Sequence, residues 1–137
     1  MYGSLMVPRV MHDVCGHARP GVPATLHGYR RRRLHGEHYP GIRPFAGESV
    51  DGVLYGGLSG AQFAALDAFE GDWYRRQAVP VETAAGRREA QTYVLASDRG
   101  HLMSAETWSL EAFLRHGLEA FVAGYRGFTT VPDGERP

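Results

Sequence analysis

The chain has 137 residues and a formal net charge of zero, because fifteen acidic side chains balance fifteen arginines. A chain of this length fits one domain and buries about two thirds of its unfolded surface, so its core needs no covalent cross-link. The balanced charge argues against a broad nucleic-acid surface and favours a small neutral or zwitterionic partner. We expect one domain over residues 1–131 and a frayed tail at 132–137, which is rich in Pro, Gly and charged residues.

The single cysteine, Cys15, excludes an internal disulfide and a zinc site built from several cysteines. Such sparse use of cysteine is typical of a reducing compartment, so we expect a cytoplasmic protein. The N-terminus has no apolar signal core, and no stretch approaches the roughly 18 apolar residues of a membrane span. We therefore expect a soluble protein with no membrane partner, while the sequence leaves the oligomeric state open.

The first half of the chain predicts two strands. Residues 24–34 carry the apolar Leu26 and Tyr29 and read as a strand, before a polar segment that ends at Tyr39-Pro40-Gly41. Residues 50–55 have the apolar content of a second strand.

A helix is expected next, and the sequence marks both of its ends. Ser59 and Gln62 have the spacing of a capping box, in which each side chain bonds the other residue's backbone N–H. Apolar residues then recur at every third position, namely Phe63, Leu66 and Phe69. Gly71 suits the left-handed position after a helix, so Glu70 is expected in the last turn.

The second half predicts a hairpin and a closing helix. Residues 79–81 and 90–95 flank Ala85-Gly86-Arg87, which has the composition of a hairpin turn, and Pro80 indicates an edge strand or a bulge. After Ser109 an apolar stripe predicts a long helix. The stripe comprises Leu110, Phe113, Leu114, Leu118, Phe121, Val122 and Tyr125, with Gly124 or Gly127 as the stop.

Two short motifs carry candidate chemistry. In Tyr2-Gly3-Ser4-Leu5 a Gly allows a sharp turn, and consecutive N–H groups can bind an oxyanion or a carboxylate; the alternative is an ordinary loop. Glu70 faces the negative end of its helix dipole, and Asp67 and Asp72 add like charge, so we expect a raised pKa. The dipole contributes only about 0.3–1 kcal/mol, so a base poised near neutrality also needs burial; otherwise Glu70 is a solvated helix-end acid.

These motifs give the chain a family resemblance. Tyr2-Gly3-Ser4-Leu5 stands at the start of the chain, and Phe69-Glu70-Gly71 stands before Tyr74-Arg75 further on, with Tyr39-Pro40 and Val53-Leu54-Tyr55 between the two motifs. In this order they make the chain resemble the gamma-glutamylcyclotransferase-like family of AIG-type and gamma-glutamylamine cyclotransferase-like proteins. The resemblance runs from residue 2 to about Tyr93 and implies an α+β fold, a small mixed β-barrel with flanking helices. It implies Glu70 as the catalytic residue, and as substrate-binding residues Tyr2, Gly3, Ser4, Leu5, Tyr39 and Tyr74.

Members of this family usually have an apolar strand before the loop, whereas here one residue precedes Tyr2. We therefore expect either a start codon further upstream or a barrel with one strand fewer. The aromatic residues Phe69, Trp73 and Tyr74 are expected to supply the burial that Glu70 needs.

The resemblance also implies a reaction. Family members cleave a gamma-glutamyl compound through attack of its own alpha-amine on the gamma-carbonyl, giving 5-oxoproline and a free amine without a cofactor. In this acyl transfer Glu70 would move the protons, and the leaving group could be an amino acid, a lysine side-chain amine, a peptide or a biosynthetic amine. The alternative is a non-catalytic member of the same fold that binds a small amino-acid-like ligand.

The arginine run Arg30 to Arg33 is the densest cluster of charge in the chain. Alternate residues of a strand face opposite sides, so two of the four could line a barrel mouth and hold a substrate carboxylate. The favoured interpretation is a solvated strand face. As a nucleic-acid patch the run is too short and lacks interleaved aromatic residues, so no nucleic-acid partner is expected.

The histidines raise the question of a metal site. His12, Cys15 and His17 lie close together, and His35-Gly36-Glu37-His38 offers several donors, but neither spacing matches a zinc signature. We therefore expect no metal, and a metal-dependent hydrolase is the third hypothesis. No partner base can be assigned to Cys15 or Ser4 as a nucleophile.

Overall fold

The computed structural model describes the backbone of residues 1–129 and the side chains of residues 1–124, so the tail predicted at 132–137 lies outside the described residues. In chain order the elements are the 3₁₀ turn Ser4–Met6, α1 (Pro8–Cys15), β1 (Val22–Arg33), β2 (Pro40–Leu54), α2 (Gly60–Glu70), β3 (Tyr74–Thr83), β4 (Gly86–Leu95), the 3₁₀ turn Ser97–Leu102, α3 (Leu110–His116) and α4 (Leu118–Thr129).

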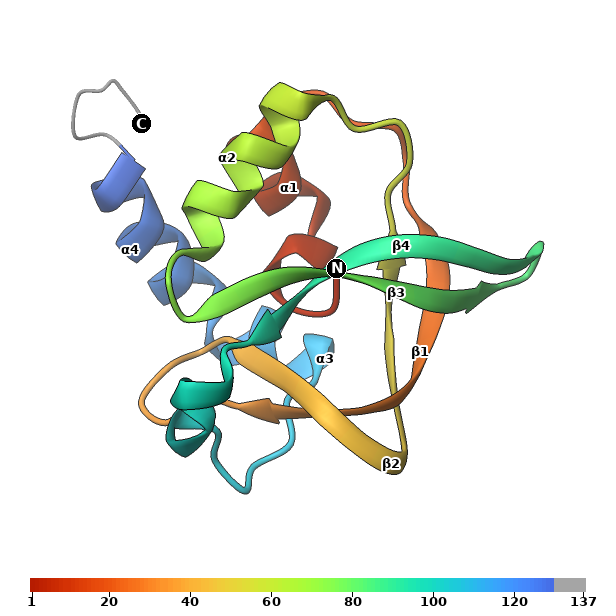
Figure 1. Ribbon diagram of the computed structural model, residues 1–137. Coiled ribbons are helices and arrows are strands. Elements are labelled where there is room, and N and C mark those ends of the chain that lie inside the picture. Colours follow the sequence, from red (N-terminus) through yellow and green to blue (C-terminus); the bar gives the residue numbers. More distant parts are fainter. Residues whose placement is uncertain (130–137) are drawn as a thin grey trace.

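The strands form one antiparallel sheet in the order β2-β1-β3-β4. β1 and β2 pair along almost their whole length, and β3 and β4 form a hairpin. In contrast, β1 and β3 are in register only at Thr25 and Glu82, so the sheet splits into two ribbons that diverge (Figure 1). The predicted α+β class is confirmed with one correction, because over the described residues the sheet stays open and does not close into a barrel.

The first two residues lie between the edge strands β2 and β4. Met1 exchanges two hydrogen bonds with Val53 of β2: its amino group donates to the Val53 carbonyl at 2.7 Å, and the Val53 N–H donates to the Met1 carbonyl at 2.8 Å. The hydroxyl of Tyr2 donates to the carbonyl of Tyr93 in β4 at 2.5 Å. These residues connect the two ribbons where the sheet is open, and they fix the start of the Tyr2 to Leu5 loop.

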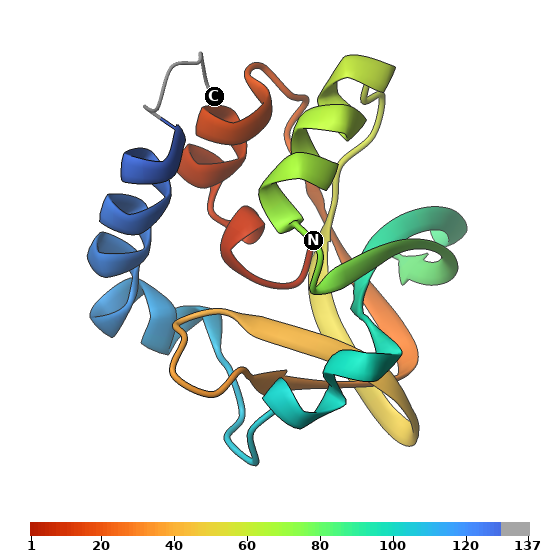
Figure 2. The same ribbon diagram turned by 60° about the vertical axis from the view of Figure 1, so that its left-hand side comes forward.

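The core has two parts, one inside the sheet and one under the helices. Between the two ribbons the side chains of Leu26, Ile42, Val50, Val79, Val81 and Val94 pack together. The second part joins the N-terminal loop, α1, α2 and α3 through Leu5, Val10, Met11, Leu66, Trp108 and Phe113. Figures 1 and 2 both show α1, α2 and α4 gathered on one side of the strands. The cavity described below lies between the end of α2, α4, residues 37–40 and the N-terminal loop.

Three elements differ from the sequence-based prediction. β2 begins at Pro40 rather than near residue 50, because pairing with β1 overrides the local Pro and Gly signals. The helix α1, which starts on Pro8, was not predicted at all. The long helix expected after Ser109 is divided into α3 and α4 at Gly117, where an added Cβ would lie 3.0 Å from His38.

The helix that carries Glu70 has the predicted ends. The Ser59 hydroxyl accepts from the Gln62 N–H at 3.1 Å, and the Gln62 side chain accepts from the Ser59 N–H at 2.9 Å, which confirms the capping box. Gly71 ends the helix with φ 76°, a backbone conformation that favours glycine. No helix within residues 1–129 is long and apolar enough to cross a membrane.

Candidate active site

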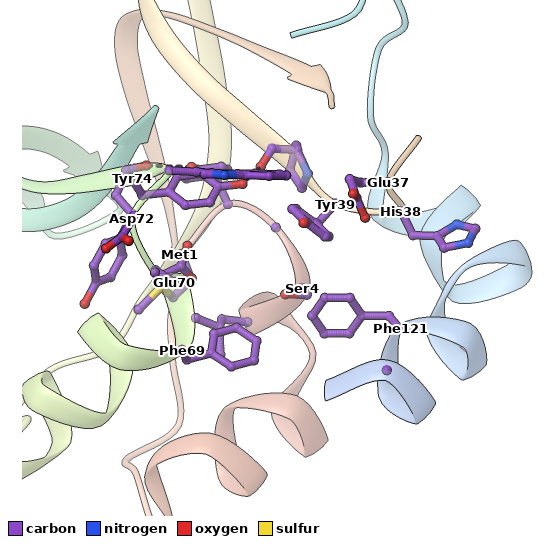
Figure 3. Close-up of a pocket in the computed structure, with 18 of the residues that line it drawn as sticks. Met1, Ser4, Glu37, His38, Tyr39, Phe69, Glu70, Asp72, Tyr74 and Phe121 are labelled. Atoms are coloured by element: carbon purple, nitrogen blue, oxygen red, sulfur yellow. Dashed lines mark hydrogen bonds between the residues drawn. The ribbon is translucent and has the colours of Figure 1, made fainter. Parts of the chain in front are cut away.

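A cavity of about 470 Å³ opens where the N-terminal loop, residues 37–40, the end of α2 and α4 meet (Figure 3). Segments far apart in the sequence therefore contribute its walls. Every residue that the sequence predicted for the site lines this cavity, namely Glu70, Tyr2, Gly3, Ser4, Leu5, Tyr39 and Tyr74. The structure thus brings the predicted residues together, and it leaves their roles in a reaction as a proposal.

Glu70 is the last residue of α2 and its half-buried carboxyl group lines the cavity. Within the described part of the chain no hydrogen bond or ion pair joins this carboxyl group to another side chain. Burial raises its pKa to about 7, and the nearby amino group of Met1 offsets part of that effect. A carboxyl group in this state can both accept and donate a proton near neutral pH.

The expected contribution of Asp67 to this raised pKa does not arise, because Asp67 is already paired. Its carboxylate accepts from Arg76 at 2.9 Å and from the Tyr93 hydroxyl at 2.5 Å. Arg76 lies in β3 and Tyr93 in β4, so this network ties α2 to the hairpin one turn before Glu70. Burial, and not a neighbouring acid, sets the pKa of Glu70.

The N-terminal loop turns sharply at Gly3 and continues into the 3₁₀ turn. The N–H of Met6 bonds the Gly3 carbonyl at 2.9 Å, and the N–H of Val7 bonds the Ser4 carbonyl at 3.1 Å. The first N–H groups of any helical turn lack partners within it, and Gly3 provides no side-chain cap. The amides of Ser4 and Leu5 therefore have no partner inside this turn, and both residues line the cavity.

Gly3 is held against Pro40 so closely that a side chain does not fit. A Cβ at this position would lie 2.9 Å from Cδ and 3.1 Å from Cγ of the Pro40 ring. We expect Gly3→Ala to lower the free energy of unfolding by about 1–3 kcal/mol, because the rigid, buried ring has little room to move. Urea unfolding of the variant would measure this effect.

The matched control for this variant is Gly60→Ala. Gly60 is the first residue of α2, and an added Cβ would meet no atom within 4 Å. Alanine is favoured over glycine in a helix, so this variant should be at least as stable as the parent chain. Equal destabilisation by both substitutions would contradict close packing of Gly3 against Pro40.

The three tyrosines around the cavity differ in what their hydroxyl groups can do. Tyr2 donates to the Tyr93 carbonyl at 2.5 Å, and Tyr74 donates to the Pro40 carbonyl at 2.8 Å. Both groups are buried and occupied, so these two residues offer the cavity mainly their rings. Tyr39 is half-buried, and burial together with the adjacent Glu37 raises its pKa to about 12, so it remains a neutral phenol.

Aromatic side chains form one wall of the cavity, and the sequence predicted Phe69 and Trp73 as cover for Glu70 but did not place Phe121 at the site. The ring of Phe121 in α4 contacts Tyr39 and Phe69 edge-on, with centroids 6.0 and 6.1 Å apart, and Trp73 lies 6.5 Å from Tyr39. Phe121 belongs to the apolar stripe predicted for the last helix, but a stripe does not show which of its members meets a cavity. Glu37 was considered only as a metal donor, and it also lines the cavity.

The arginine run does not line this cavity, so the idea that it holds a substrate carboxylate there is wrong. The prediction of a solvated strand face is also wrong, because all of these side chains are half-buried and hydrogen-bonded. Among residues 1–124, no group of three or more His, Cys, Asp or Glu side chains is arranged to hold a metal ion. The thiol of Cys15 donates to the Met11 carbonyl at 3.3 Å.

Comparisons with known proteins agree with this geometry. Residues 1–110 match the family described as "Gamma-glutamyl cyclotransferase, AIG2-like". Protein AIG2 B of Arabidopsis thaliana is 31% identical over 139 residues, covering 98% of this chain and 82% of that protein. AIG2-like protein C of the same plant is 31% identical over 130 residues, covering 93% and 75%.

Solved structures show the same fold. An Arabidopsis thaliana protein determined in solution superposes with a TM-score of 0.68 and 29% identity, covering 97% of this chain and 92% of that one. A structure described as "Gamma-glutamyl cyclotransferase" superposes with a TM-score of 0.63 and 19% identity, covering 70% and 64%, and so speaks for the fold alone. The family match over residues 1–110, together with these relatives, shows that the chain belongs to the AIG2-like gamma-glutamyl cyclotransferase family.

Proposed function

We propose that this protein converts a gamma-glutamyl compound into 5-oxoproline and a free amine, with Glu70 as the general acid and base. The observation that carries the proposal is a half-buried carboxyl group with a pKa of about 7 and no partner side chain among the described residues, facing a cavity beside unoccupied loop amides. Family membership supports the same reaction class.

The proton movements need only one residue. The ionised Glu70 takes a proton from the alpha-ammonium of the substrate as that nitrogen attacks the gamma-carbonyl carbon and the new ring C–N bond forms. The carbonyl oxygen becomes an oxyanion, and the amides of Ser4 and Leu5 are the donors available to stabilise it. Glu70 then gives its proton to the departing nitrogen as the original C–N bond breaks and the carbonyl forms again, which restores the carboxylate. The ring nitrogen still carries one extra proton, which the restored carboxylate takes and passes to the released amine, so the amine leaves as an ammonium ion.

The aromatic wall suits the other demand of this reaction, which is conformational. Attack within one molecule reaches effective molarities of about 10⁵ to 10⁸ M when the reacting atoms are held in line. Tyr39, Phe69 and Phe121 line the cavity, and we expect their rings to favour a folded substrate over an extended one. On this proposal the protein lowers the barrier mainly by confinement and proton transfer.

The test is release of 5-oxoproline from a panel of gamma-glutamyl amino acids and gamma-glutamyl amines. Release that requires Glu70 would establish the activity, and its rank order would identify the leaving amine. Binding of these compounds without turnover, measured by calorimetry, would instead support the non-catalytic ligand-binding protein.

We also expect the rate to follow the ionisation of Glu70. Only the carboxylate form can accept the first proton, so kcat/KM should rise as the pH passes through about 7. The rise should end where the ammonium group of the substrate itself loses its proton. A pH profile of kcat/KM checks this, and a rate that falls as the pH rises through the same range would argue against Glu70 as the base.

A further inference from the structure

Arg31 of β1 bonds the backbone of the N-terminal loop. Its Nη1 lies 2.9 Å from the carbonyl oxygen of Tyr2 and 2.9 Å from the carbonyl oxygen of Asp51 in β2. Burial lowers the pKa of this guanidinium, but arginine keeps its charge at neutral pH. One charged nitrogen therefore fastens the first residue of the loop to the edge of the sheet.

A second contact holds the same guanidinium in place and reaches another wall of the cavity. The guanidinium carbon lies 5.2 Å from the ring centroid of Trp108, which is buried. The Trp108 Nε1–H donates to the carbonyl oxygen of His38 at 2.9 Å. Figure 3 shows Glu37, His38 and Tyr39 on one side of the cavity and Met1 and Glu70 on the other. Arg31 and Trp108 thus connect the N-terminal loop with His38 on the other side of the cavity.

Arg33 lies two residues after Arg31, on the same face of β1, and it also bonds a backbone carbonyl beside the cavity. Its Nε lies 2.5 Å from the carbonyl oxygen of Glu37, and its Nη1 lies 3.2 Å from the Glu106 carboxylate. The residues that alternate with this pair make different contacts. Arg30 and Arg32 lie 2.6 and 3.6 Å from Glu48, away from the cavity.

We propose that Arg31 is a positioning residue for the cyclisation, which fixes the backbone of the Tyr2 to Leu5 loop so that the Ser4 and Leu5 amides stay aligned with the substrate. This inference rests on the proposed function for its effect on rate. A misplacement of about 1 Å at a reacting centre can cost about 10²-fold in rate, so loss of one of the contacts that align this loop should be felt in the rate.

The contacts favour arginine over other residues at this position. The planar guanidinium can stack on Trp108 while one of its nitrogens reaches two carbonyl oxygens. A lysine ammonium can donate to one or both oxygens but has no plane to stack. A methionine keeps the apolar stem and donates nothing, so it leaves the Tyr2 and Asp51 carbonyls without this donor.

The first test is amide hydrogen exchange, which does not depend on turnover. The N–H groups of Met6 and Val7 bond back to Gly3 and Ser4, so they report on the integrity of the loop. We expect exchange at both amides to be about tenfold faster or more in Arg31→Met, because the loop opens locally, with exchange in β4 unchanged. The matched control is Arg30→Met, which removes a contact to Glu48 on the outer face and should leave the loop amides unaltered.

The second test is kinetic. Arg31→Met should lower kcat/KM for 5-oxoproline release by about 10- to 100-fold, and Arg31→Lys should recover part of that loss. The pH at which the rate rises should not move, because Arg31 does not contact Glu70. Arg30→Met should match the parent chain.

The outcomes separate this inference from the function on which it rests. Faster loop exchange with a fall in kcat/KM supports the positioning role. Unchanged exchange at Met6 and Val7, or an activity loss that only follows a fall in global stability, overturns it. A parent chain that folds but releases no 5-oxoproline would refute the proposed function, while the exchange data would still decide whether Arg31 holds the loop.

Discussion

Glu70→Gln is expected to lower kcat/KM for 5-oxoproline release by about 10²- to 10⁴-fold, the usual contribution of a positioned general acid or base. Glutamine has almost the same shape as glutamate, but its amide cannot accept a proton at neutral pH. The fold should survive the change, because the carboxyl group has no hydrogen-bond partner among the described residues that would be lost. Steady-state assays with the best substrate of the panel measure the effect.

The control for this variant is Glu89→Gln, which makes the same chemical change at an exposed position of β4. It should leave the activity of the parent chain unaltered. Circular dichroism and thermal unfolding then show whether Glu70→Gln is folded at the assay temperature. An activity loss that matches a loss of folded protein would mean that Glu70 has a structural role and not a catalytic one.

The location of Glu70 was predictable because local signals mark both ends of its helix. The capping box of Ser59 and Gln62 starts α2 and Gly71 ends it, and both signals act within a few residues. The burial of Glu70 was not predictable in the same way. Trp73 was expected to contribute, but the N-terminal loop and α4 also surround the cavity, and only the folded chain brings these segments together.

The strands show the same division between local and long-range information. The predicted strand at 24–34 agrees with β1, and the predicted hairpin agrees with β3 and β4 apart from its bounds. The first ten residues of β2 were missed because Pro40 and Pro44 interrupt the local pattern. Their strand conformation follows from pairing with β1, where Pro44 lies opposite Tyr29. Closure of the sheet likewise depends on long-range pairing, because it needs the edge strands β2 and β4 to pair, and over the described residues they do not.

The arginine run shows how a charge pattern becomes informative only in the structure. The sequence predicted that successive arginine side chains of β1 face opposite sides of the sheet, and Arg31 and Arg30 do contact different partners, the Tyr2 carbonyl and Glu48. What each side chain bonds depends on β2 and on the N-terminal loop, which lie at other places in the sequence. Arg31 reaches a backbone carbonyl and not a substrate, a distinction that residue type alone does not make.

The second prediction of large effect is that Glu70→Gln stabilises the folded chain at alkaline pH while it removes activity. The pKa of Glu70 is about 7 in the folded protein against 4.5 for an unperturbed glutamate. Below pH 4.5 the group is protonated in both states, and its contribution to stability is fully present. As the pH rises toward 7 the unfolded chain loses this proton first, so the free energy of unfolding falls, and above 7 the loss is complete.

Glutamine does not titrate, so the stability of the variant relative to the parent should increase across this window. One pKa unit corresponds to about 1.4 kcal/mol, and because the carboxyl group is only half-buried we expect a gain of about 1–3 kcal/mol at pH 8 compared with pH 4. Urea unfolding of the parent, Glu70→Gln and Glu89→Gln at both pH values gives the comparison, and effects that do not depend on pH cancel in the difference.

A constant difference between parent and Glu70→Gln would show that the carboxyl group titrates normally in the folded chain. It would also remove the reason why this glutamate, and not another acid of the chain, is suited to accept and return a proton near neutral pH. A stability gain accompanied by loss of turnover would identify Glu70 as a residue whose strained burial serves the reaction and not the fold.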